Sequence, residues 1–406
     1  MKSRLIIISE FFYPDENATG YLLTQIAKGL AGIADIRVLC RKRKDRFCDK
    51  ETLFPFHDNI VVERIHSTGF NKDKLVLRII NILTLSISLF LKLLTELQEG
   101  DRVIVVTNPP SLPFIAAIAC RLKRARYSIL VHDVYPEVLI ATKVIHEGHL
   151  IALVLRWMTK KILESSENVI VLGRDMAHLL TRNYRTIGNR INIIPNWGDI
   201  DSIFPEDRLD NSILNEVSLE KKFVVQYVGN IGRTHNVELL VECAELLRDR
   251  DDIHFLFIGD GAKRRWLLES IKDRNLKNVI MKPFYPRNRQ SDVHNACDIV
   301  VISFIPGMAG ISVPSRMYNI MAAGKPIIGI TDTTSELARV IQEEGIGWVI
   351  PSYHAQDVVK VIMAAQKENK ELRTMGLRAR KAAEEKYSFE KIIPLYRNLF
   401  ISKGKG

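Results

Sequence analysis

The chain has 406 residues, of which 47% are apolar and 26% are charged, an ordinary composition for a soluble protein with ample material for buried cores. At about 150 residues per domain, this length allows two to three domains. The formal net charge is +11, and residues 1–200 hold 28 basic and 20 acidic side chains against 30 and 27 in residues 201–406. A basic first half favours an anionic partner, such as nucleic acid, lipid headgroups or a phosphate-bearing substrate.

The five cysteines are scattered, with no CxxC pair and no metal-ligand spacing. This pattern suggests neither a disulfide framework nor a zinc site, and it favours a reducing cytoplasm. The N-terminal apolar run Leu5–Ser9 is too short for the core of a signal peptide, so we expect no export. The basic residues are not interleaved with aromatic ones and no reader module is present, which argues against a nucleic-acid partner.

Short β-branched runs alternate with helical patterns along the whole chain. Strands that are apolar on both faces and separated by helices predict parallel sheets covered on both sides. In the first half the runs are Leu5–Ile8, Ile36–Leu39, Ile60–Ile65, Arg102–Val106, Tyr127–Val131, Val169–Leu172 and Ile191–Ile194. In the second half they are Phe223–Val228, His254–Ile258, Val279–Met281, Ile299–Ser303, Pro326–Ile330 and Gly347–Ile350.

These two sets of strands predict an α/β chain with two Rossmann-like lobes. Between the sets, Asp199–Leu219 is polar and irregular and contains Pro205, which is the composition of a connector. We therefore place the first lobe at residues 1–200 and the second at residues 201–386.

The segment Lys74–Gln98 is a long helical candidate, rich in Leu and Ile with few charges. Its longest uncharged stretch, Ile79–Leu91, is shorter than the roughly 18–20 residues of a spanning helix, so we expect that it does not cross a bilayer. Two interpretations remain open: a buried helix of the first lobe, or a helix whose outer face touches the membrane interface. The basic residues Lys72, Lys74, Arg78 and Lys92, with Arg41–Lys44 nearby in sequence, favour the second.

Ligands of open parallel sheets bind beyond the carboxyl ends of the strands, so the loops there are the places to search. After the first strand, a long loop ends at Gly20 before a helix expected at Tyr21–Leu30, where backbone could approach an anion. An ordinary turn explains this loop equally well. After the fourth strand, Asn108 lies in a rigid proline turn. The fifth strand ends in titratable groups that could exchange protons near neutral pH, namely His132, Asp133 and Glu137.

Three loops of the second half carry glycines at strand ends. The first, Gly229–Thr234, combines backbone donors with the guanidinium of Arg233, which suits a diphosphate. The second, Ile258–Gly261, is equally consistent with a plain turn. In the third, Pro306–Asn319, a helix is expected to begin with Ser312 or Val313 near its cap and Arg316 in its first turn. The candidate donor-binding residues of these loops are Gly229, Asn230, Gly232, Gly259, Gly261, Gly310, Ile311, Ser312, Ser315 and Asn319.

Together these motifs resemble the retaining, nucleotide-sugar-dependent glycosyltransferases of the GT-B fold, family four. Within that family the chain is similar to the branch that builds bacterial O-antigen, capsule and colanic acid and includes L-fucosamine transferases. The order and spacing of the motifs extend over nearly the whole chain. The matching segments are Phe11–Pro14 with Gly20, Arg78–Asn81, Asn108–Pro110, Asp133–Glu137, Val171–Leu172 with Met176, Ile194–Trp197, Gly229–Gly232, Gly259–Gly261, Val313–Asn319 and Ala322–Pro326.

The resemblance implies two lobes that face each other across a cleft, with the acceptor on the first and the nucleotide diphosphate on the second. It implies that residues 387–406 complete the first lobe through a crossing helix at Tyr387–Phe400. The implied donor is a UDP-sugar carrying an N-acetylated deoxysugar such as L-FucNAc. The implied acceptor is a polyprenyl-diphosphate saccharide at the cytoplasmic face of the inner membrane, where the enzyme is peripheral. The expected acceptor or membrane residues are Asn108, Glu137, Arg78 and Lys92.

The chain departs from the family at two glutamates. Family four usually carries a Glu-x7-Glu arrangement at the last nucleotide loop, one glutamate near the donor sugar and one on the ribose. The corresponding residues here are Ile311 and Asn319. Asn319 can still hydrogen-bond to a ribose, whereas Ile311 offers only its backbone. We therefore expect contacts to the sugar from main-chain amides near Gly310, or from elsewhere in the chain. The lysine common after the glycine-rich loop is replaced by His235.

We hypothesise a reaction in which the bond between anomeric carbon and diphosphate breaks while an acceptor hydroxyl attacks. Charge develops on the leaving diphosphate, so we expect the largest effect to be electrostatic, from Arg233, Arg316 and helix amides after Gly310. His132 is expected to contact the donor near the reacting centre, and Asp133 to orient it or assist the acceptor. No metal or other cofactor is expected, because no carboxylate pair sits where it would bridge the diphosphate.

Two alternatives stay open. An epimerase or hydrolase with the same fold would turn over nucleotide-sugar without any acceptor. A non-catalytic partner, which the missing glutamates make conceivable, would bind UDP but release none from any donor.

Overall fold

The computed structural model describes residues 3–42, 58–70 and 75–401 of the chain. Two compact units are present. Unit 1 comprises Met1–Ile140, Ile145–Pro195 and Ile393–Gly406, and unit 2 comprises Ala141–Val144 and Asn196–Ile392. The units therefore meet in the sequence at residues 195 and 392, where the sequence analysis places the boundaries at residues 200 and 386.

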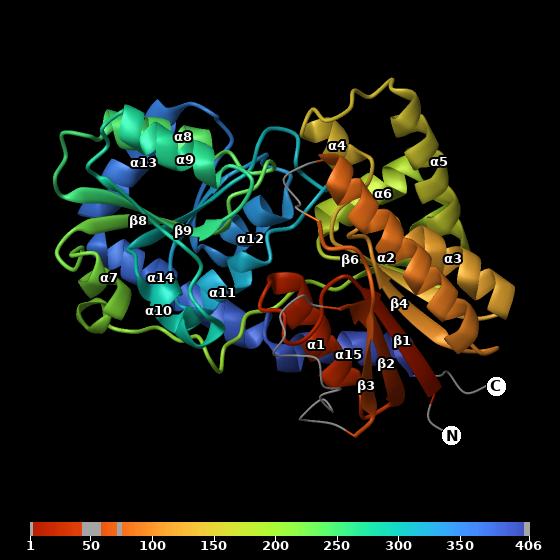
Figure 1. The fold of residues 1–406 in the computed structure, drawn as a ribbon. Coiled ribbons are helices and arrows are strands. Elements are labelled where there is room, and N and C mark those ends of the chain that lie inside the picture. The colour runs from red at the N-terminus through yellow and green to blue at the C-terminus, as the bar shows by residue number, and fades with distance from the viewer. Residues whose placement is uncertain (1–2, 43–57, 71–74, 402–406) are drawn as a thin grey trace. The chain divides into compact units, whose positions relative to one another are not determined.

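Unit 1 contains a seven-stranded parallel sheet (Figure 1) with the strand order β3-β2-β1-β4-β5-β6-β7. Its central strands are buried on both faces, as in β4, where Val103 to Val106 are all fully buried. This is the burial expected of parallel strands covered by helices on both sides. The strands are β1 (Ser3–Ser9), β2 (Ala34–Arg41), β3 (Ile60–Ile65), β4 (Arg102–Val106), β5 (Arg126–Val131), β6 (Asn168–Val171) and β7 (Ile191–Ile193).

The helices of unit 1 connect these strands in the α/β alternation that the sequence predicts. Helix α1 begins at Ala18, earlier than the predicted Tyr21, because the Asn17 side chain accepts a hydrogen bond from the Gly20 amide and caps the helix. The helical elements are α1 (Ala18–Leu30), α2 (Leu75–Glu96), α3 (Leu112–Lys123), α4 (Glu137–Ala141), α5 (Leu150–Ser165), α6 (Arg174–Asn183) and the 3-10 helix η2 (Arg185–Arg190).

Unit 2 contains a six-stranded parallel sheet with the strand order β10-β9-β8-β11-β12-β13. All five residues of β11 are buried, so this sheet is also covered on both faces. The strands are β8 (Phe223–Asn230), β9 (Ile253–Asp260), β10 (Val279–Lys282), β11 (Ile299–Ser303), β12 (Ile327–Ile330) and β13 (Gly347–Ile350). Each of the thirteen runs predicted from sequence forms a strand, and the prediction of two Rossmann-like lobes is confirmed.

The helices of unit 2 are short before β11 and longer after β13. Its helical elements are η3 (Arg208–Asp210), α7 (Ser212–Glu216), α8 (Val237–Leu246), α9 (Arg264–Asp273), η4 (Arg287–Arg289), α10 (Gln290–Asn295), α11 (Arg316–Ala322), α12 (Glu336–Glu344), α13 (Ala355–Lys367), α14 (Asn369–Glu385) and α15 (Phe389–Phe400), the last of which continues into unit 1.

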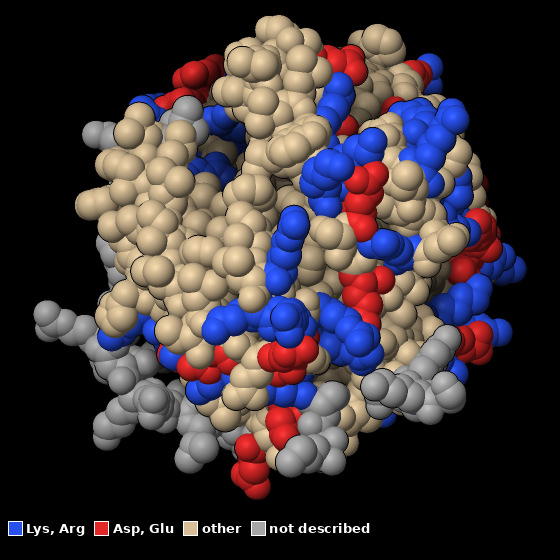
Figure 2. Space-filling view, turned by 90° about the vertical axis from the view of Figure 1, so that its right-hand side faces the viewer, with Lys and Arg blue, Asp and Glu red and all other residues tan. Residues whose placement is uncertain are grey.

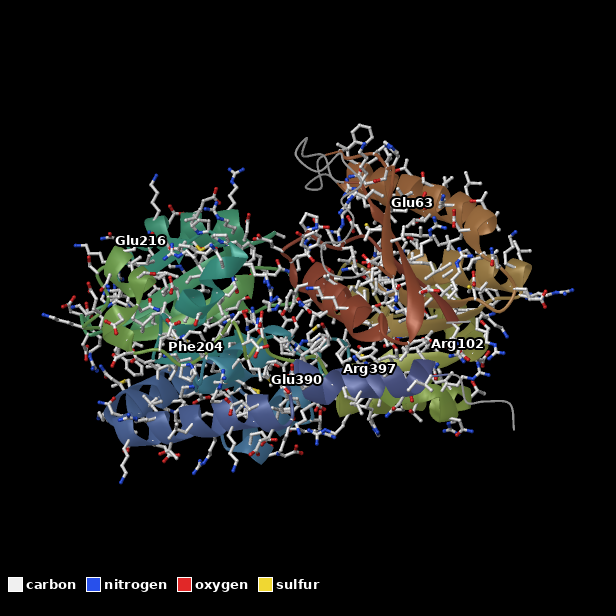
Figure 3. All side chains as sticks on the ribbon, turned by 90° about the horizontal axis from the view of Figure 1, so that it is seen from below. Glu63, Arg102, Phe204, Glu216, Glu390 and Arg397 are labelled. Carbon is white, nitrogen blue, oxygen red and sulfur yellow. The ribbon has the colours of Figure 1, made fainter. Side chains whose placement is uncertain are left out.

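The C-terminal helix α15 belongs to unit 1 from Ile393 onward. Gly29 of α1 leaves space for it, because a Cβ at Gly29 would lie 2.6 Å from Cγ2 of Ile393. Arg397 donates a hydrogen bond to the Gly29 carbonyl at 2.7 Å, and Arg102 donates to the Phe400 carbonyl at 2.9 Å. Figure 3 labels both arginines at the C-terminal helix. Close packing and two arginine contacts therefore fasten the end of the chain to unit 1.

His294, in α10, is a buried histidine whose charge is linked to stability. Burial, followed by the charges of Arg287 and Arg316, lowers its pKa from 6.5 to about 4. Between these two pH values the unfolded chain binds a proton that the folded chain does not, so the protein should lose stability as the pH falls from 6.5 towards 4.

Between pH 7 and pH 5 we expect His294 to cost the parent about 2 kcal/mol of unfolding free energy, a loss that the His294→Gln variant should not show. Urea titrations of parent and variant at both pH values measure this difference. His146→Gln, at an exposed histidine, is the control and should keep the parent's pH dependence. The assignment is wrong if His294→Gln keeps it too.

Candidate functional site

The glycine-containing loops of unit 2 lie together because their strands are neighbours. Strands β9, β8 and β11 are adjacent, so their carboxyl ends meet at one edge of the sheet. The Ile231 amide donates to the Asp260 carbonyl at 2.8 Å, and the Ile305 amide donates to the Thr234 carbonyl at 3.0 Å. Backbone hydrogen bonds therefore join the three loops into one surface.

Glycines allow the carboxyl ends of β8 and β9, where Gly229 and Gly259 are paired, to pack closely on each other. Gly229, Gly259 and Gly261 have φ values of +121°, +155° and +150°. A Cβ at Gly259 would lie 1.9 Å from the Gly229 carbonyl oxygen, and a Cβ at Gly261 would lie 2.5 Å from Oδ1 of Asn230. A Cβ at Gly232 would lie 2.8 Å from Nδ2 of Asn230. A Cβ at Gly229 would lie 3.1 Å from Nη1 of Arg316. In this structure the absent side chains of these glycines leave room for close contacts within unit 2, whereas the sequence analysis expects the glycines to face a donor.

Arg316 places a partly unsatisfied cation at this edge. Its Nη1 donates to the Val228 carbonyl at 3.0 Å, and its guanidinium lies 4.5 Å from the centre of the Tyr227 ring. Its Nε and Nη2 atoms are buried and have no hydrogen-bond partner among the described residues. Buried donors are nearly always satisfied, and guanidinium groups suit phosphate oxygens, so this arrangement fits an anionic ligand.

Helix α11 begins at Arg316 and not near Ser312, so the predicted start is wrong. Ser315 is the N-cap residue but makes no capping hydrogen bond with its side chain. Val313 precedes a proline, and such residues disfavour helical backbone, which delays the helix. Helix α11 has seven residues, and its first residue, Arg316, lies at the site.

The two residues at the family's glutamate positions are already engaged. Ile311 is buried, and its amide donates to the Met308 carbonyl at 3.0 Å, so it does not offer the main-chain donor expected of it. Gly310, with φ +75°, precedes it in the turn. Oδ1 of Asn319 accepts a hydrogen bond from the Asp199 amide at 3.1 Å. Asn319 thereby holds the start of the connector.

The other polar residues of the loops differ in exposure. Arg233 is exposed and forms no ion pair within the described part of the chain. The His235 ring stacks on Phe304 with 5.3 Å between ring centres. Burial, followed by the charges of Arg316 and Lys263, lowers the pKa of His235 well below its usual value. His235 is therefore neutral at pH 7 and does not replace the charge of the family's lysine.

In unit 1 the loops after β1, β4 and β5 lie side by side for the same topological reason. Oγ1 of Thr107 accepts hydrogen bonds from the amides of His132 and Asp133, at 3.0 and 3.2 Å, and so ties the β4 loop with Asn108 to the β5 loop. Burial lowers the pKa of His132 to about 4. This corrects the expectation of proton exchange near neutral pH, because His132 is neutral there.

Glu137 and Gly20 have structural partners. The Glu137 carboxylate is buried and accepts from Nε of Arg156 at 3.3 Å, which occupies one of its oxygens. The Gly20 amide donates to Asn17, and a Cβ at Gly20 would lie 2.9 Å from the Asp15 carbonyl. The expected anion contact from the Gly20 amide is therefore corrected to a helix cap.

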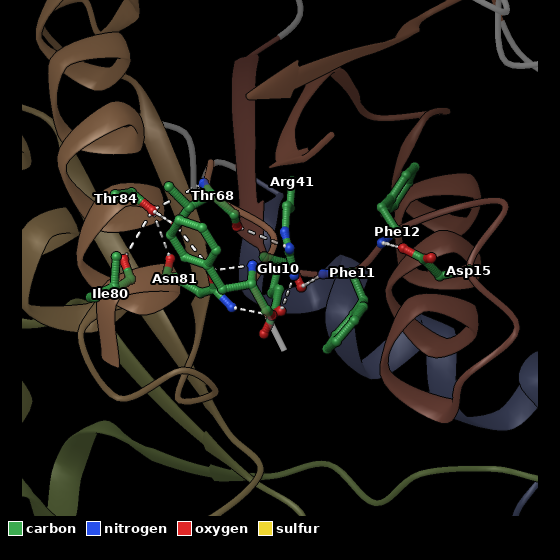
Figure 4. A network of polar contacts seen from close by, with 11 residues as sticks. Glu10, Phe11, Phe12, Asp15, Arg41, Thr68, Ile80, Asn81 and Thr84 are labelled. Atoms are coloured by element: carbon green, nitrogen blue, oxygen red, sulfur yellow. Dashed lines mark hydrogen bonds and ion pairs between the residues drawn. The ribbon is translucent and has the colours of Figure 1, made fainter. Parts of the chain in front are cut away.

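A polar network holds α2 against the ends of β1 and β2 (Figure 4). Arg41 donates to Oε1 of Glu10 and to the Thr68 carbonyl, both at 3.1 Å. Asn81 of α2 is buried and accepts from the Thr68 hydroxyl and the Phe70 amide, both at 2.9 Å. Its Nδ2 returns a bond to the Phe70 carbonyl at 2.9 Å. These directional bonds fix which face of α2 points outward.

The outward face of α2 is apolar. Leu85, Leu89 and Leu93 are buried on the inner face. The exposed large side chains recur every three or four residues, at Val76, Ile79, Leu83, Ile87 and Leu91. This exposure contradicts a helix that is buried all round. Exposed apolar surfaces of this kind mark interaction sites.

The length and composition of Val76–Glu96 would allow it to cross a membrane, although the uncharged stretch alone argues against it. Core helices of soluble proteins meet the same criteria, and α2 packs on α3 within unit 1. Arg78 is exposed beside the apolar face. Lys92 instead forms ion pairs with Glu63 at 2.6 Å and Glu96 at 2.8 Å, so its predicted membrane role is corrected to a structural one. Lys72 and Lys74 lie outside the described residues.

The sequence analysis missed Thr107 and Tyr227 as organising residues. Thr107 stands beside the predicted proline turn, and its hydroxyl could have been recognised as an acceptor for neighbouring amides. Tyr227 lies in a strand buried on both faces, where sequence alone gives no sign that its ring supports a cation. Within the described residues, no group of three or more His, Cys, Asp or Glu side chains could hold a metal ion.

Each half of the chain matches a glycosyltransferase family model. Residues 20–202 match the model described as "Glycosyltransferase Family 4", and residues 211–382 match "Glycosyl transferases group 1". The first range contains every strand of the unit 1 sheet except β1, and the second contains the whole sheet of unit 2.

Related proteins extend the comparison over most of the chain. It is 28% identical over 357 residues to a probable glycosyltransferase, WbjE, of Pseudomonas aeruginosa, covering 86% of each chain. It is 23% identical over 271 residues to the putative colanic acid biosynthesis glycosyl transferase WcaI of Escherichia coli K12, covering 65% of this chain and 66% of that protein.

Solved structures agree with the fold. Sucrose-phosphate synthase from Thermosynechococcus elongatus superposes with a TM-score of 0.78 at 17% identity, over 99% of this chain and 100% of that one. Anabaena HepE in complex with UDP-glucose superposes with a TM-score of 0.73 at 14% identity, over 98% of this chain and 99% of that one.

The contact between Gly259 and the Gly229 carbonyl, at the paired ends of β8 and β9, can be tested by adding a single carbon. We expect Gly259→Ala to lower the unfolding free energy by about 2 kcal/mol or more, because a Cβ meets backbone that cannot move aside and the φ value disfavours alanine. Denaturant titration measures the change. Gly32→Ala is the matched control, because nothing lies within 4 Å of a Cβ there. Equal stability of the two variants would contradict the packing role.

Proposed function

The chain has the GT-B fold of the group 1 and family 4 glycosyltransferases, and on that premise we propose that it transfers a sugar from a UDP-sugar to a saccharide linked to polyprenyl diphosphate. The transfer retains the anomeric configuration. The sugar is an N-acetylated deoxysugar such as L-FucNAc, and the product is a bacterial surface polysaccharide such as O-antigen or capsule. The likeness to the colanic acid enzyme and to HepE with UDP-glucose supports this proposal.

The observation that carries the proposal is the guanidinium of Arg316. Two of its nitrogen atoms are buried without partners at the edge where three strand-end loops meet. A bound diphosphate would satisfy both donors, and the exposed Arg233 in the neighbouring loop would add a second positive charge. Unit 2 is thus the donor unit.

The reaction breaks the bond between the anomeric carbon and the diphosphate oxygen, and the electron pair stays on the diphosphate. Arg316 and Arg233 stabilise the charge that develops there. The oxygen of the acceptor hydroxyl forms the new bond to the anomeric carbon, and the proton of that hydroxyl passes to the departing diphosphate. His132 is neutral at pH 7, so it binds the donor through a hydrogen bond without acting as a cation, and Asp133 orients it or assists the acceptor. These steps need no metal.

The acceptor is anchored in lipid, and we propose that the protein is peripheral at the cytoplasmic face of the inner membrane. The exposed apolar face of α2, with Arg78 beside it, supports this location. Apolar side chains flanked by cations suit the interface of an anionic membrane.

Removing a cation that acts on the leaving group should slow transfer more than it weakens nucleotide binding. We expect Arg316→Ala and Arg233→Ala each to lower kcat about 10²–10³-fold. Release of UDP from a donor in the presence of acceptor measures kcat, and calorimetry with UDP measures binding. Arg265→Ala, at a 91% exposed side chain in unit 2, is the control. Folded Arg316→Ala and Arg233→Ala proteins with parental kcat and UDP affinity would refute the phosphate role.

The donor, acceptor and metal requirement can be tested in one assay. Purified protein is incubated with UDP-, GDP- and dTDP-sugars and a synthetic polyprenyl-diphosphate saccharide, and products are weighed by mass spectrometry. We expect a product only with a UDP-sugar and equal rates with EDTA or magnesium. Loss of activity in EDTA that magnesium restores would overturn the metal-free reaction. Free sugar formed without acceptor would indicate a hydrolase, and UDP binding without turnover would indicate a binding protein.

A further inference from the structure

Helix α5 exposes an apolar face that no sequence motif indicates. Leu150, Leu153, Val154 and Trp157 are 71%, 52%, 46% and 62% exposed. Their spacing of three and four residues puts them on one side of the helix, while Ala152, Ile162 and Leu163 are buried on the other side. Surface helices normally turn their apolar side to the core and a polar side to water. Helix α5 is apolar on both sides over this stretch.

The neighbouring helices continue this face. Helix α3 contacts both α2 and α5, and it exposes Phe114, Ile118 and Leu122. A groove of about 910 Å³ lies between α3 and α5, and its lining includes Phe114, Ile118 and Trp157. With the apolar stripe of α2, the three helices form one surface, which we call the α2–α3–α5 face. Such a large apolar area is unusual on a soluble monomer and marks an interaction site.

Cations border the α2–α3–α5 face at the ends of α3 and α5. Arg121 precedes Leu122 near the end of α3, Arg126 begins β5, and Lys160 and Lys161 follow Trp157 on α5. The side chains of Lys160 and Lys161 are 50% and 61% exposed and lie 3.9 and 3.7 Å from the Glu164 carboxylate. Arg126 is 65% exposed and lies 3.3 Å from Glu167. All three are much more exposed than Lys92, whose side chain is 27% exposed in its ion pairs. Figure 2 looks onto this side of unit 1 and shows a broad area without charged side chains beside a group of Lys and Arg.

We propose that the α2–α3–α5 face docks on an anionic lipid bilayer, with α5 lying in the interface and Trp157 as its anchor. Apolar residues enter the boundary of the acyl chains, tryptophan favours the headgroup level, and the bordering cations attract anionic lipid. The cations beside this apolar surface favour anionic lipid over an apolar protein partner. The inference deepens the proposed membrane association, on which it rests, by moving the principal contact from α2 alone to α5.

The test measures co-sedimentation with vesicles of phosphatidylglycerol and phosphatidylcholine. We expect Leu153→Glu and Trp157→Glu each to lower the partition coefficient about tenfold or more, because each removes one buried side chain from the apolar contact. Leu377→Glu in α14 of unit 2, at a 68% exposed leucine, is the matched control and should bind like the parent. Trp157→Phe, which keeps the apolar surface, should bind but lose the blue shift of tryptophan fluorescence on vesicle addition.

Parental binding by the Leu153→Glu and Trp157→Glu proteins would overturn the proposal, even if Leu83→Glu in α2 binds poorly. Equal binding to pure phosphatidylcholine would also overturn it, because the cations would then have no role. A parent that is dimeric without lipid, and that Leu153→Glu makes monomeric, would show that a second copy covers this face. Transfer to a short-chain, water-soluble acceptor should be the same in Leu153→Glu and parent. If the parent fails this transfer but binds vesicles, the proposed function fails and the docking surface stands.

Discussion

The backbone contact between Gly229 and Gly259 is the constraint on which the candidate donor site depends. Any side chain at Gly259 would enter the Gly229 carbonyl. Gly229 and Gly259 are paired at the carboxyl ends of β8 and β9, so the two strands meet there without side chains between them. At the same edge Arg316 donates to the Val228 carbonyl and lies over the Tyr227 ring. The position of the cation thus follows from the absence of two side chains.

This packing also changes what the glycines mean. A glycine-rich loop at a strand end is often interpreted as a backbone surface for phosphate. Here the lack of side chains is used within the protein, and the unsatisfied donors belong to a guanidinium. The chemistry proposed for unit 2 therefore depends on two arginines more than on main-chain amides.

Unit 1 shows the converse arrangement, in which polar bonds determine where apolar surface is exposed. Asn81 is bound on both sides of its amide by Thr68 and Phe70, which sets the rotation of α2 about its axis. The leucines that face inward then pack on the sheet, and those on the opposite side have no room in the core. The network therefore determines which apolar side chains of α2 are exposed.

The sequence by itself determined the two sheets, because strands buried on both faces are continuous apolar runs and each of the thirteen is visible in the chain. It also determined which loops meet, since parallel strands bring their carboxyl ends to one edge. Only the tertiary structure decided what each residue does there. Neighbours distant in the chain decide whether Gly259 faces a ligand or a carbonyl and whether Lys92 meets lipid or two glutamates. They also decide whether the His132 ring is charged. The outward side of α5 is likewise set by packing, because its first turns, Leu150–Leu155, are apolar on every side and give no pattern that indicates which side is left exposed.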